Sequence, residues 1–161
     1  MRELLIADAG PLIALARIDR LWLLPRLFAQ TITTEIVWSE CFANPSDVEQ
    51  ARLNLALAAG WVERVAVPAL PHDWRLGLGE TSAISLALAH QAAVLIDERA
   101  ARRTATRLGL PLIGTVGLLT LAKQRELIPA IREDLYHLAA SGYRLSPDLL
   151  SNALAFVGEA P

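Results

Sequence analysis

The sequence is poor in the residues that form several common kinds of site. It contains one cysteine and three histidines among 161 residues, and its formal net charge is −2. A single cysteine excludes an intrachain disulfide, and so few cysteine and histidine side chains disfavour a zinc centre. The slightly acidic balance gives no general basic surface of the kind that many nucleic-acid-binding proteins carry. Any contact with nucleic acid must therefore be local.

Long apolar runs are missing as well, although 53% of the residues are hydrophobic. No stretch reaches the roughly 20 apolar residues of a membrane span. The apolar run near the first residue is too short for a signal peptide, so we expect a cytoplasmic protein that makes no membrane contact. The lone cysteine, Cys41, fits a reducing compartment and has no catalytic motif around it, so we expect a small core residue.

Short apolar runs alternate with longer helical patterns along the chain. Runs of strand length occupy residues 3–7, 31–33, 62–67, 93–96 and 111–114. Helical periodicity occupies residues 11–18, 34–42, 46–59, 79–91, 100–108, 116–125, 129–141 and 147–157. This alternation predicts an α/β fold with a mostly parallel sheet covered on both faces. We expect a single domain over residues 1–161, in which residues 129–161 are a C-terminal helical extension that packs on the rest.

Several helix ends are marked in the sequence. Ser46 is followed three residues later by Glu49, the spacing of a capping box at the start of a helix. Gly60, Gly109 and Gly142 stand where helical patterns end, and glycine is the residue that most readily takes the left-handed conformation found there. These positions support the predicted boundaries.

Four acidic residues stand where the apolar pattern should continue inward. Asp8 and Asp97 each follow a strand-like run, and ligands of parallel α/β sheets bind beyond such strand ends. Glu80 lies at helical spacing from the apolar residues that follow it, and Glu40 from those that precede it. Two carboxylates about 5 Å apart at an effective dielectric constant of about 20 repel by roughly 3 kcal/mol, so converging acids require a cation. Oxygen ligands predict Mg²⁺ or Mn²⁺.

Each acid also has a structural interpretation that needs no metal. Asp8 and Asp97 are suited to cap the helices that follow them, because aspartate accepts hydrogen bonds from free N–H groups. Glu80 suits the first turn of a helix, where the helix dipole favours negative charge, and Glu40 suits a solvent-facing helix end. However, three of the four lie at strand-to-helix junctions, where N–H groups keep carboxylates ionised, and a divalent cation requires ionised acids.

The stretches that carry these acids, taken in order, resemble the PIN-domain ribonuclease superfamily, which includes VapC-type toxins, and within it a PIN-like branch. They are IADAGPLIALARI (6–18), TTEIVWSE (33–40), LGLGETSAISLALA (76–89), AVLIDERAARRTA (93–105) and PLIGTVGLLTLAK (111–123). The resemblance implies a three-layer α/β/α sandwich around a mostly parallel sheet. It also implies an acidic cluster that binds Mg²⁺ or Mn²⁺ and cleaves RNA.

The resemblance assigns a role to each matching residue. The catalytic and metal-binding acids are Asp8, Glu40, Glu80 and Asp97. We expect Asp8 and Asp97 to be direct ligands, Glu80 to bind directly or through water, and Glu40 to bridge a second ion or orient a water. Arg102 matches the arginine that this branch carries five residues after the last acid, and Thr115 follows the last strand. We expect both Arg102 and Thr115 to bind substrate.

Two departures from the family pattern bear on the site. Many relatives place a hydroxyl or amide side chain where this chain has Ala9 and Gly10. Many toxins also have a Thr-x-Asp turn where this chain has Ile96, Asp97 and Glu98, so Glu98 is an alternative or additional ligand beside Asp97.

Arginines clustered on one predicted helix supply the local positive charge that RNA binding requires. They are Arg99, Arg102, Arg103 and Arg107, at the spacing of one helix face. We expect them to contact RNA phosphates, and the alternative is a solvated surface where they pair with acids. Of the four tryptophans, Trp74 is the one to test for stacking on a base. A histidine base is not expected, because none of His72, His90 and His137 falls among the acids.

The function expected from the resemblance is metal-dependent endoribonuclease activity, extending to the toxin of a toxin–antitoxin pair. The expected partners are an RNA substrate, a protein antitoxin and a second copy in a homodimer. The alternative is a PIN-like protein with little nuclease activity that binds RNA or protein, which the missing polar side chains at positions 9 and 10 favour. Phosphoryl-transfer domains also cluster aspartates at strand ends, but the first strand here lacks an Asp-x-Asp sequence.

Overall fold

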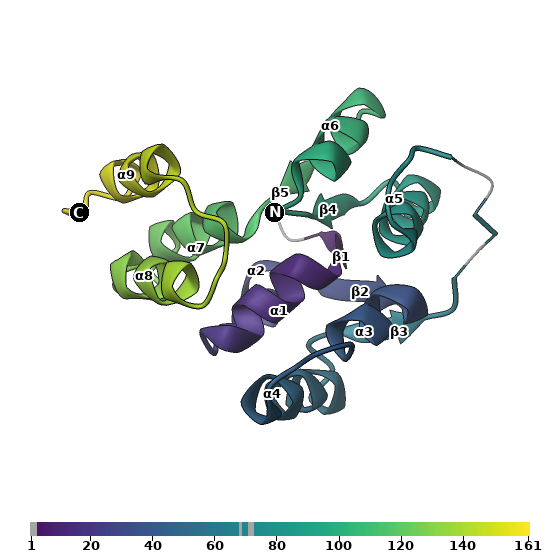
Figure 1. Ribbon diagram of the computed structural model, residues 1–161, viewed down its shortest axis with the longest axis horizontal. Coiled ribbons are helices and arrows are strands. Elements are labelled where there is room, and N and C mark those ends of the chain that lie inside the picture. Colours follow the sequence, from purple (N-terminus) through teal and green to yellow (C-terminus); the bar gives the residue numbers. More distant parts are fainter. Residues whose placement is uncertain (1–2, 68, 71–72) are drawn as a thin grey trace.

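A five-stranded sheet forms the centre of the structure (Figure 1). The computed structural model describes residues 3–67, 69–70 and 73–161. The strands are β1 (Leu4–Ala7), β2 (Gln30–Thr34), β3 (Glu63–Val65), β4 (Ala93–Leu95) and β5 (Leu112–Ile113). They lie in the order β3-β2-β1-β4-β5, and every neighbouring pair is parallel. The α/β/α fold around a mostly parallel sheet is thus confirmed.

Helices flank the sheet and correspond to the predicted patterns with one addition. They are α1 (Ala9–Arg17), α2 (Leu23–Leu27), α3 (Glu35–Cys41), α4 (Asp47–Ala58), α5 (Leu78–His90), α6 (Arg99–Arg107), α7 (Thr115–Gln124), α8 (Arg132–Ala140) and α9 (Pro147–Phe156). The short helix α2 was not predicted, because its five residues, LLPRL, are too few to show a helical period and include a proline. No helix within the described ranges has the length and apolar character needed to cross a membrane.

The order of the strands places a switch point beside β1. The chain runs from β1 outward to β2 and β3, then returns to β4 on the other side of β1. In such sheets a crevice opens beyond the carboxyl ends of the two strands where the direction reverses. Asp8 immediately follows β1, and its N–H donates to the Leu95 carbonyl of β4 at 3.0 Å. The carboxyl ends of β1 and β4 therefore lie side by side.

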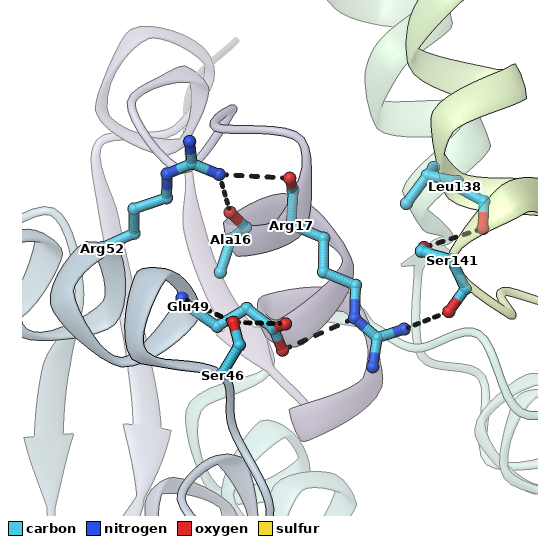
Figure 2. Close-up of polar contacts among 7 residues, drawn as sticks. All are labelled: Ala16, Arg17, Ser46, Glu49, Arg52, Leu138 and Ser141. Atoms are coloured by element: carbon cyan, nitrogen blue, oxygen red, sulfur yellow. Dashed lines mark hydrogen bonds and ion pairs between the residues drawn. The ribbon is translucent and has the colours of Figure 1, made fainter.

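The C-terminal end of α1 joins two distant parts of the chain (Figure 2). The Arg52 guanidinium of α4 donates to the carbonyls of Ala16 and Arg17, at 2.9 and 3.1 Å. Positive charge is favoured there because the carbonyl end of a helix is negative. Arg17 pairs with Glu49 and also donates to the Ser141 carbonyl at 3.3 Å. The N–H of Glu49 donates to the Ser46 hydroxyl, as the capping box predicts.

The C-terminal helices contribute to the core. Figure 1 shows α7, α8 and α9 grouped on one side of the molecule, with α5 on the other. Leu135, Leu138 and Leu154 are fully buried, whereas Leu149 is 42% and Phe156 67% exposed. Some of the apolar side chains in the segment 129–161 therefore belong to the core, and others lie on the surface. Cys41 is buried, as predicted.

Candidate functional site

Asp8 is a buried carboxylate with an unpartnered oxygen. It precedes α1, but its side chain accepts no capping hydrogen bond, and its Oδ1 has no partner. Only 5% of the residue is exposed. Burial raises the pKa of Asp8 from 3.8 to about 7, and the negative charges of Glu80, Glu40 and Asp97 add to this rise. Asp8 thus makes no capping hydrogen bond to α1, although the N–H of Ala9 opposes the rise in its pKa, and the other three acids lie close enough for their charges to raise it.

Glu80 lies in the first turn of α5, where it has a structural contact as well as a place in the site. Its carboxylate accepts the N–H of Gly77 at 3.2 Å. Burial raises the pKa of Glu80, helped by the nearby charge of Glu98, although the Gly77 N–H opposes the rise. Glu80 therefore serves the start of α5 and also lies close enough to Asp8 for its charge to raise the pKa of Asp8.

Glu40 reaches the site from an exposed position at the end of α3. The predicted inward-facing stripe is wrong here, because Glu40 is exposed to solvent. Its carboxylate nevertheless lies directly against Gly79 in the first turn of α5, so closely that a Cβ atom on Gly79 would overlap it. The packing of α3 on α5, which brings Glu40 to Glu80, is a tertiary contact that helical periodicity does not reveal.

Asp97 and Glu98 have different partners. Glu98, not Asp97, caps α6: its carboxylate accepts the N–H of Ala101 at 2.9 Å, and this bond lowers the pKa of Glu98. Asp97 instead accepts the N–H and the hydroxyl of Thr115, at 2.8 and 2.6 Å. The capping interpretation of Asp97 is therefore wrong, and Asp97 faces the start of α7.

Thr115 and Arg102 both support the segment around Asp97. Thr115 has no exposed surface, so it cannot contact a substrate as predicted, and it orients Asp97 instead. The Arg102 Nη1 donates to the carbonyl of Ile96 at 2.7 Å. A Cβ atom on Gly114 would lie 2.8 Å from this nitrogen and 3.0 Å from Asp97 Oδ1. The absence of a side chain at Gly114 therefore lets the guanidinium and the carboxylate approach the same point.

Buried hydroxyls beneath the acids were missed by the sequence reasoning. Thr33 donates to the Ala7 carbonyl at 2.7 Å, next to Asp8. Thr34 accepts the N–H of Val37 and contacts the Ser82 hydroxyl at 2.7 Å, while Ser82 donates to the Gly79 carbonyl. Since Ser82 has one proton to give, Thr34 is the donor in their contact. This chain of bonds fixes α3 against the first turn of α5.

The signal for these hydroxyls is present in the sequence. Thr33 follows Ile32 in β2, Ser82 precedes Ala83 and Ile84 in α5, and these two residues and Thr34 are all fully buried. Tyr143, from the turn after α8, was also missed. Burial, followed by the charge of Asp97, raises the pKa of Tyr143 above its usual range, so its hydroxyl stays protonated.

The acids gather without forming a ready set of metal ligands. Across residues 3–67, 69–70 and 73–161, no three histidine, cysteine, aspartate or glutamate side chains are arranged to hold one ion. Asp97 is held by Thr115, and Glu80 by Gly77. The donors still fit a hard divalent cation, because all are carboxylates and Asp8 presents a buried oxygen with no partner.

A groove of about 750 Å³ adjoins the acids at Asp97. Its lining residues are Asp97, Arg99, Arg102, Arg103, Thr106, Arg107 and Leu112. The predicted common face of the four arginines is confirmed, and none of the ion pairs within the described ranges involves them. The four arginines thus make no ion pair with an acid in the part of the chain that the structure describes, although the charge of Arg103 helps to lower the pKa of Glu98. The groove therefore carries an excess of positive charge beside the acids.

The remaining candidates lie apart from the acids or pack on the core. His90 is exposed at the opposite end of α5 from Glu80, and His137 is exposed on α8. His72 lies outside the described residues. Trp74 is half-buried and packs against the core.

The metal-free protein should lose stability as the pH rises from about 4 to about 7. In the unfolded chain the Asp8 carboxyl titrates near 3.8, and in the folded protein near 7. Between these values the folded state keeps a proton that the unfolded state releases, so the stabilisation is complete below about pH 4 and lost above about pH 7. The difference corresponds to at most about 4 kcal/mol. Urea unfolding with chelator across this range measures it.

Asp8→Asn should flatten this dependence and stabilise the metal-free protein above about pH 7. The matched control is Asp148→Asn, because Asp148 is exposed in the first turn of α9. The control should keep the wild-type profile. An Asp8→Asn protein with an unchanged slope would show that another group carries the dependence.

The comparisons with known proteins agree with the fold described above. A family model described as a PIN domain matches residues 4–159. No curated protein matches the chain. Because the match extends over nearly the whole sequence, the chain belongs to the PIN-domain family, whose fold is of the nuclease type.

Proposed function

We propose that the protein is a metal-dependent endoribonuclease whose metal-binding and catalytic acids are Asp8, Glu40, Glu80 and Asp97. The observation that carries the proposal is Asp8, a buried carboxylate with an unpartnered oxygen and a pKa raised to about 7. A buried charge of this kind is stable only when it is neutralised or paired. Mg²⁺ or Mn²⁺ pairs it and at the same time relieves its repulsion with the other acids.

The acids differ in what they contribute. A divalent ion held by these acids would lower the pKa of a water molecule and offset negative charge on the phosphate that is cleaved. Asp8 supplies a fixed, buried oxygen, and Asp97 supplies a carboxylate oriented by two bonds from Thr115. Glu80 accepts the Gly77 N–H through Oε1 and lies beside Glu98 at the start of α5. Glu40 is the most exposed of the four, which suits it to orient water or to bridge a second ion.

The arginine groove is the proposed binding surface for the RNA backbone. It begins at Asp97, so a strand bound along it leads directly to the acids. Arg102 uses Nη1 to bind the Ile96 carbonyl, which leaves its other N–H groups for a phosphate. Arg99, Arg103 and Arg107 are exposed along the same groove. A groove of this kind places phosphates by charge and does not by itself read base sequence.

Two further parts of the proposal concern partners. We propose that the protein acts in the cytoplasm as a homodimer and as the toxin of a toxin–antitoxin pair, because the family to which it belongs includes such toxins. The exposed Leu149 and Phe156 of α9 offer apolar surface for a protein partner.

A binding protein without cleavage activity is the second function we consider. It is favoured by the finding that no three acids within the described ranges are arranged as ligands of one ion. Ala9 and Gly10 also lack the hydroxyl or amide that many relatives place there. Such a protein would use the arginine groove to hold RNA and leave it intact.

The protein should cleave RNA in the presence of Mn²⁺ or Mg²⁺, and a chelator should abolish this cleavage. Asp8→Asn should lower the rate by at least about 100-fold, since even residues that only support metal ligands are worth 10- to 100-fold. The measurement is the cleavage of single-stranded and structured RNA, resolved on a gel. Asp148→Asn is again the matched control, and cleavage that survives chelator would point to a contaminating nuclease. A wild-type protein that binds RNA without cutting it would favour the binding function.

Gly79→Ala should reduce the cleavage rate by about 10-fold, as loss of a supporting group does. Its Cβ would displace the Glu40 carboxylate, whereas a Cβ on Gly77 comes no closer than 3.4 Å to Glu80 Oε1. Alanine in place of a helical glycine stabilises by about 1 kcal/mol, so lost activity would not reflect lost stability. The measurements are the cleavage rate and the melting temperature of Gly79→Ala and Glu40→Gln, with Gly77→Ala as the control. Full activity in Gly79→Ala would remove Glu40 from the site.

Arg103→Gln and Arg107→Gln should each weaken RNA binding and flatten its dependence on salt. Each phosphate contact with single-stranded nucleic acid contributes about 0.7 to the slope of log affinity against log salt concentration. Binding is measured on the Asp8→Asn background, so that RNA is not cut. Arg125→Gln is the control, because Arg125 is exposed at the end of α7 and outside the groove. Equal slopes in all variants would show that RNA binds elsewhere.

A further inference from the structure

Three arginines form a regular row along α6. Four residues of an α-helix rise about 6 Å and return to nearly the same face. Arg99, Arg103 and Arg107 have this spacing, so successive turns of the helix each carry one guanidinium. All three are exposed and line the same groove. The groove therefore presents positive charges at regular intervals along about 12 Å of helix.

The row starts beside the acids and leads away from them. Helix α6 begins directly after Glu98, so Arg99 lies at the end of the helix that follows Asp97, and Arg107 lies at the far end. Arg102 stands next to the row, where its bond to the Ile96 carbonyl holds it at the same end as Asp97. A phosphate bound at the acids would thus be followed by positive charges in one direction.

The other residues of the groove do not compete with the guanidiniums for an anion. Leu112 lines the groove from β5, the edge strand against which α6 packs, and it carries no charge. Thr106 offers only a hydroxyl. Arginine binds a phosphate through two parallel N–H bonds, and successive phosphates of one RNA strand are separated by a distance comparable to one turn of the row. The groove therefore suits the backbone of a single strand.

We propose that α6 sets the register of the RNA, with Arg99, Arg103 and Arg107 each contacting one of three consecutive phosphates on the same side of the cleaved bond. The part of this inference that concerns cleavage rests on the proposed function, whereas the binding of consecutive phosphates does not. Bonds with fewer phosphates on that side should be cleaved more slowly, because part of the row is then empty.

The number of contacts is tested by binding single-stranded RNAs of increasing length, from a dinucleotide upward, to Asp8→Asn protein in chelator. Each added phosphate should raise the slope of log affinity against log salt concentration by about 0.7, until about four phosphates fill Arg102 and the row. On the same background, Arg107→Gln should reach its final slope one phosphate earlier. Arg125→Gln is the control and should keep the full series, because Arg125 is exposed and outside the groove.

Two results of the binding experiment would overturn the proposal. One is a slope that continues to rise with length, or a final slope that Arg107→Gln leaves unchanged, because the phosphates would then bind without a fixed row. The other is tighter binding of a glutamate peptide than of an RNA with the same number of charges, because an acidic protein segment would then be the better occupant of the groove.

The register is tested by cleavage of RNAs in which one phosphate near the cleaved bond is replaced by a neutral methylphosphonate. Three consecutive positions on one side should each slow cleavage by about 3-fold, the effect of losing one exposed ion pair. At the outermost of these positions, the replacement and Arg107→Gln together should cost no more than either alone.

Sensitive positions on both sides of the cleaved bond, or additive costs at the outermost position, would overturn the register while leaving the nuclease proposal intact. If the wild type does not cleave RNA, the nuclease proposal fails, and the binding series alone decides whether the row on α6 holds consecutive phosphates.

Discussion

The burial of one carboxylate at the centre of a parallel sheet is the constraint around which the site is built. Asp8 follows the middle strand, where the chain reverses direction, and among the described residues none makes a hydrogen bond to its Oδ1. The neighbouring acids are each held by their own donors, Glu80 by Gly77 and Asp97 by Thr115. These hydrogen bonds come from neutral groups, so they orient the carboxylates and do not neutralise their charge. A divalent cation would neutralise it.

Two glycines make this arrangement possible by what they lack. Glu40 occupies the space where a Gly79 side chain would lie, and Asp97 approaches Arg102 across Gly114. Neither glycine is in the left-handed region, so close approach and not backbone conformation requires them. This differs from Gly142, whose positive φ ends α8. Glycines with the same appearance in the sequence thus serve different physical purposes.

Local patterns in the sequence predicted the features that local physics determines. Alternating strands and helices gave the parallel sheet, and a parallel sheet necessarily brings the ends of its strands to one edge, which placed Asp8 near Asp97. Helical spacing placed the arginines on one face. The cap of α6 was misassigned because glutamate is an uncommon capping residue, so Asp97 was preferred over Glu98. The rest depends on contacts between distant segments, such as Glu40 with Gly79 and Asp97 with Thr115.

The meeting of the arginine groove with the acids at Asp97 joins two opposite electrostatic fields in one continuous surface. On the proposed function, a polyanion that followed the positive groove would meet repulsion where the carboxylates begin, and a cation among the carboxylates would be held more tightly when a phosphate was near. By thermodynamic linkage each ligand would then increase the affinity for the other by the same factor. Neighbouring surfaces of opposite sign would thus provide reciprocal cooperativity between polymer and ion without any change in the shape of the fold.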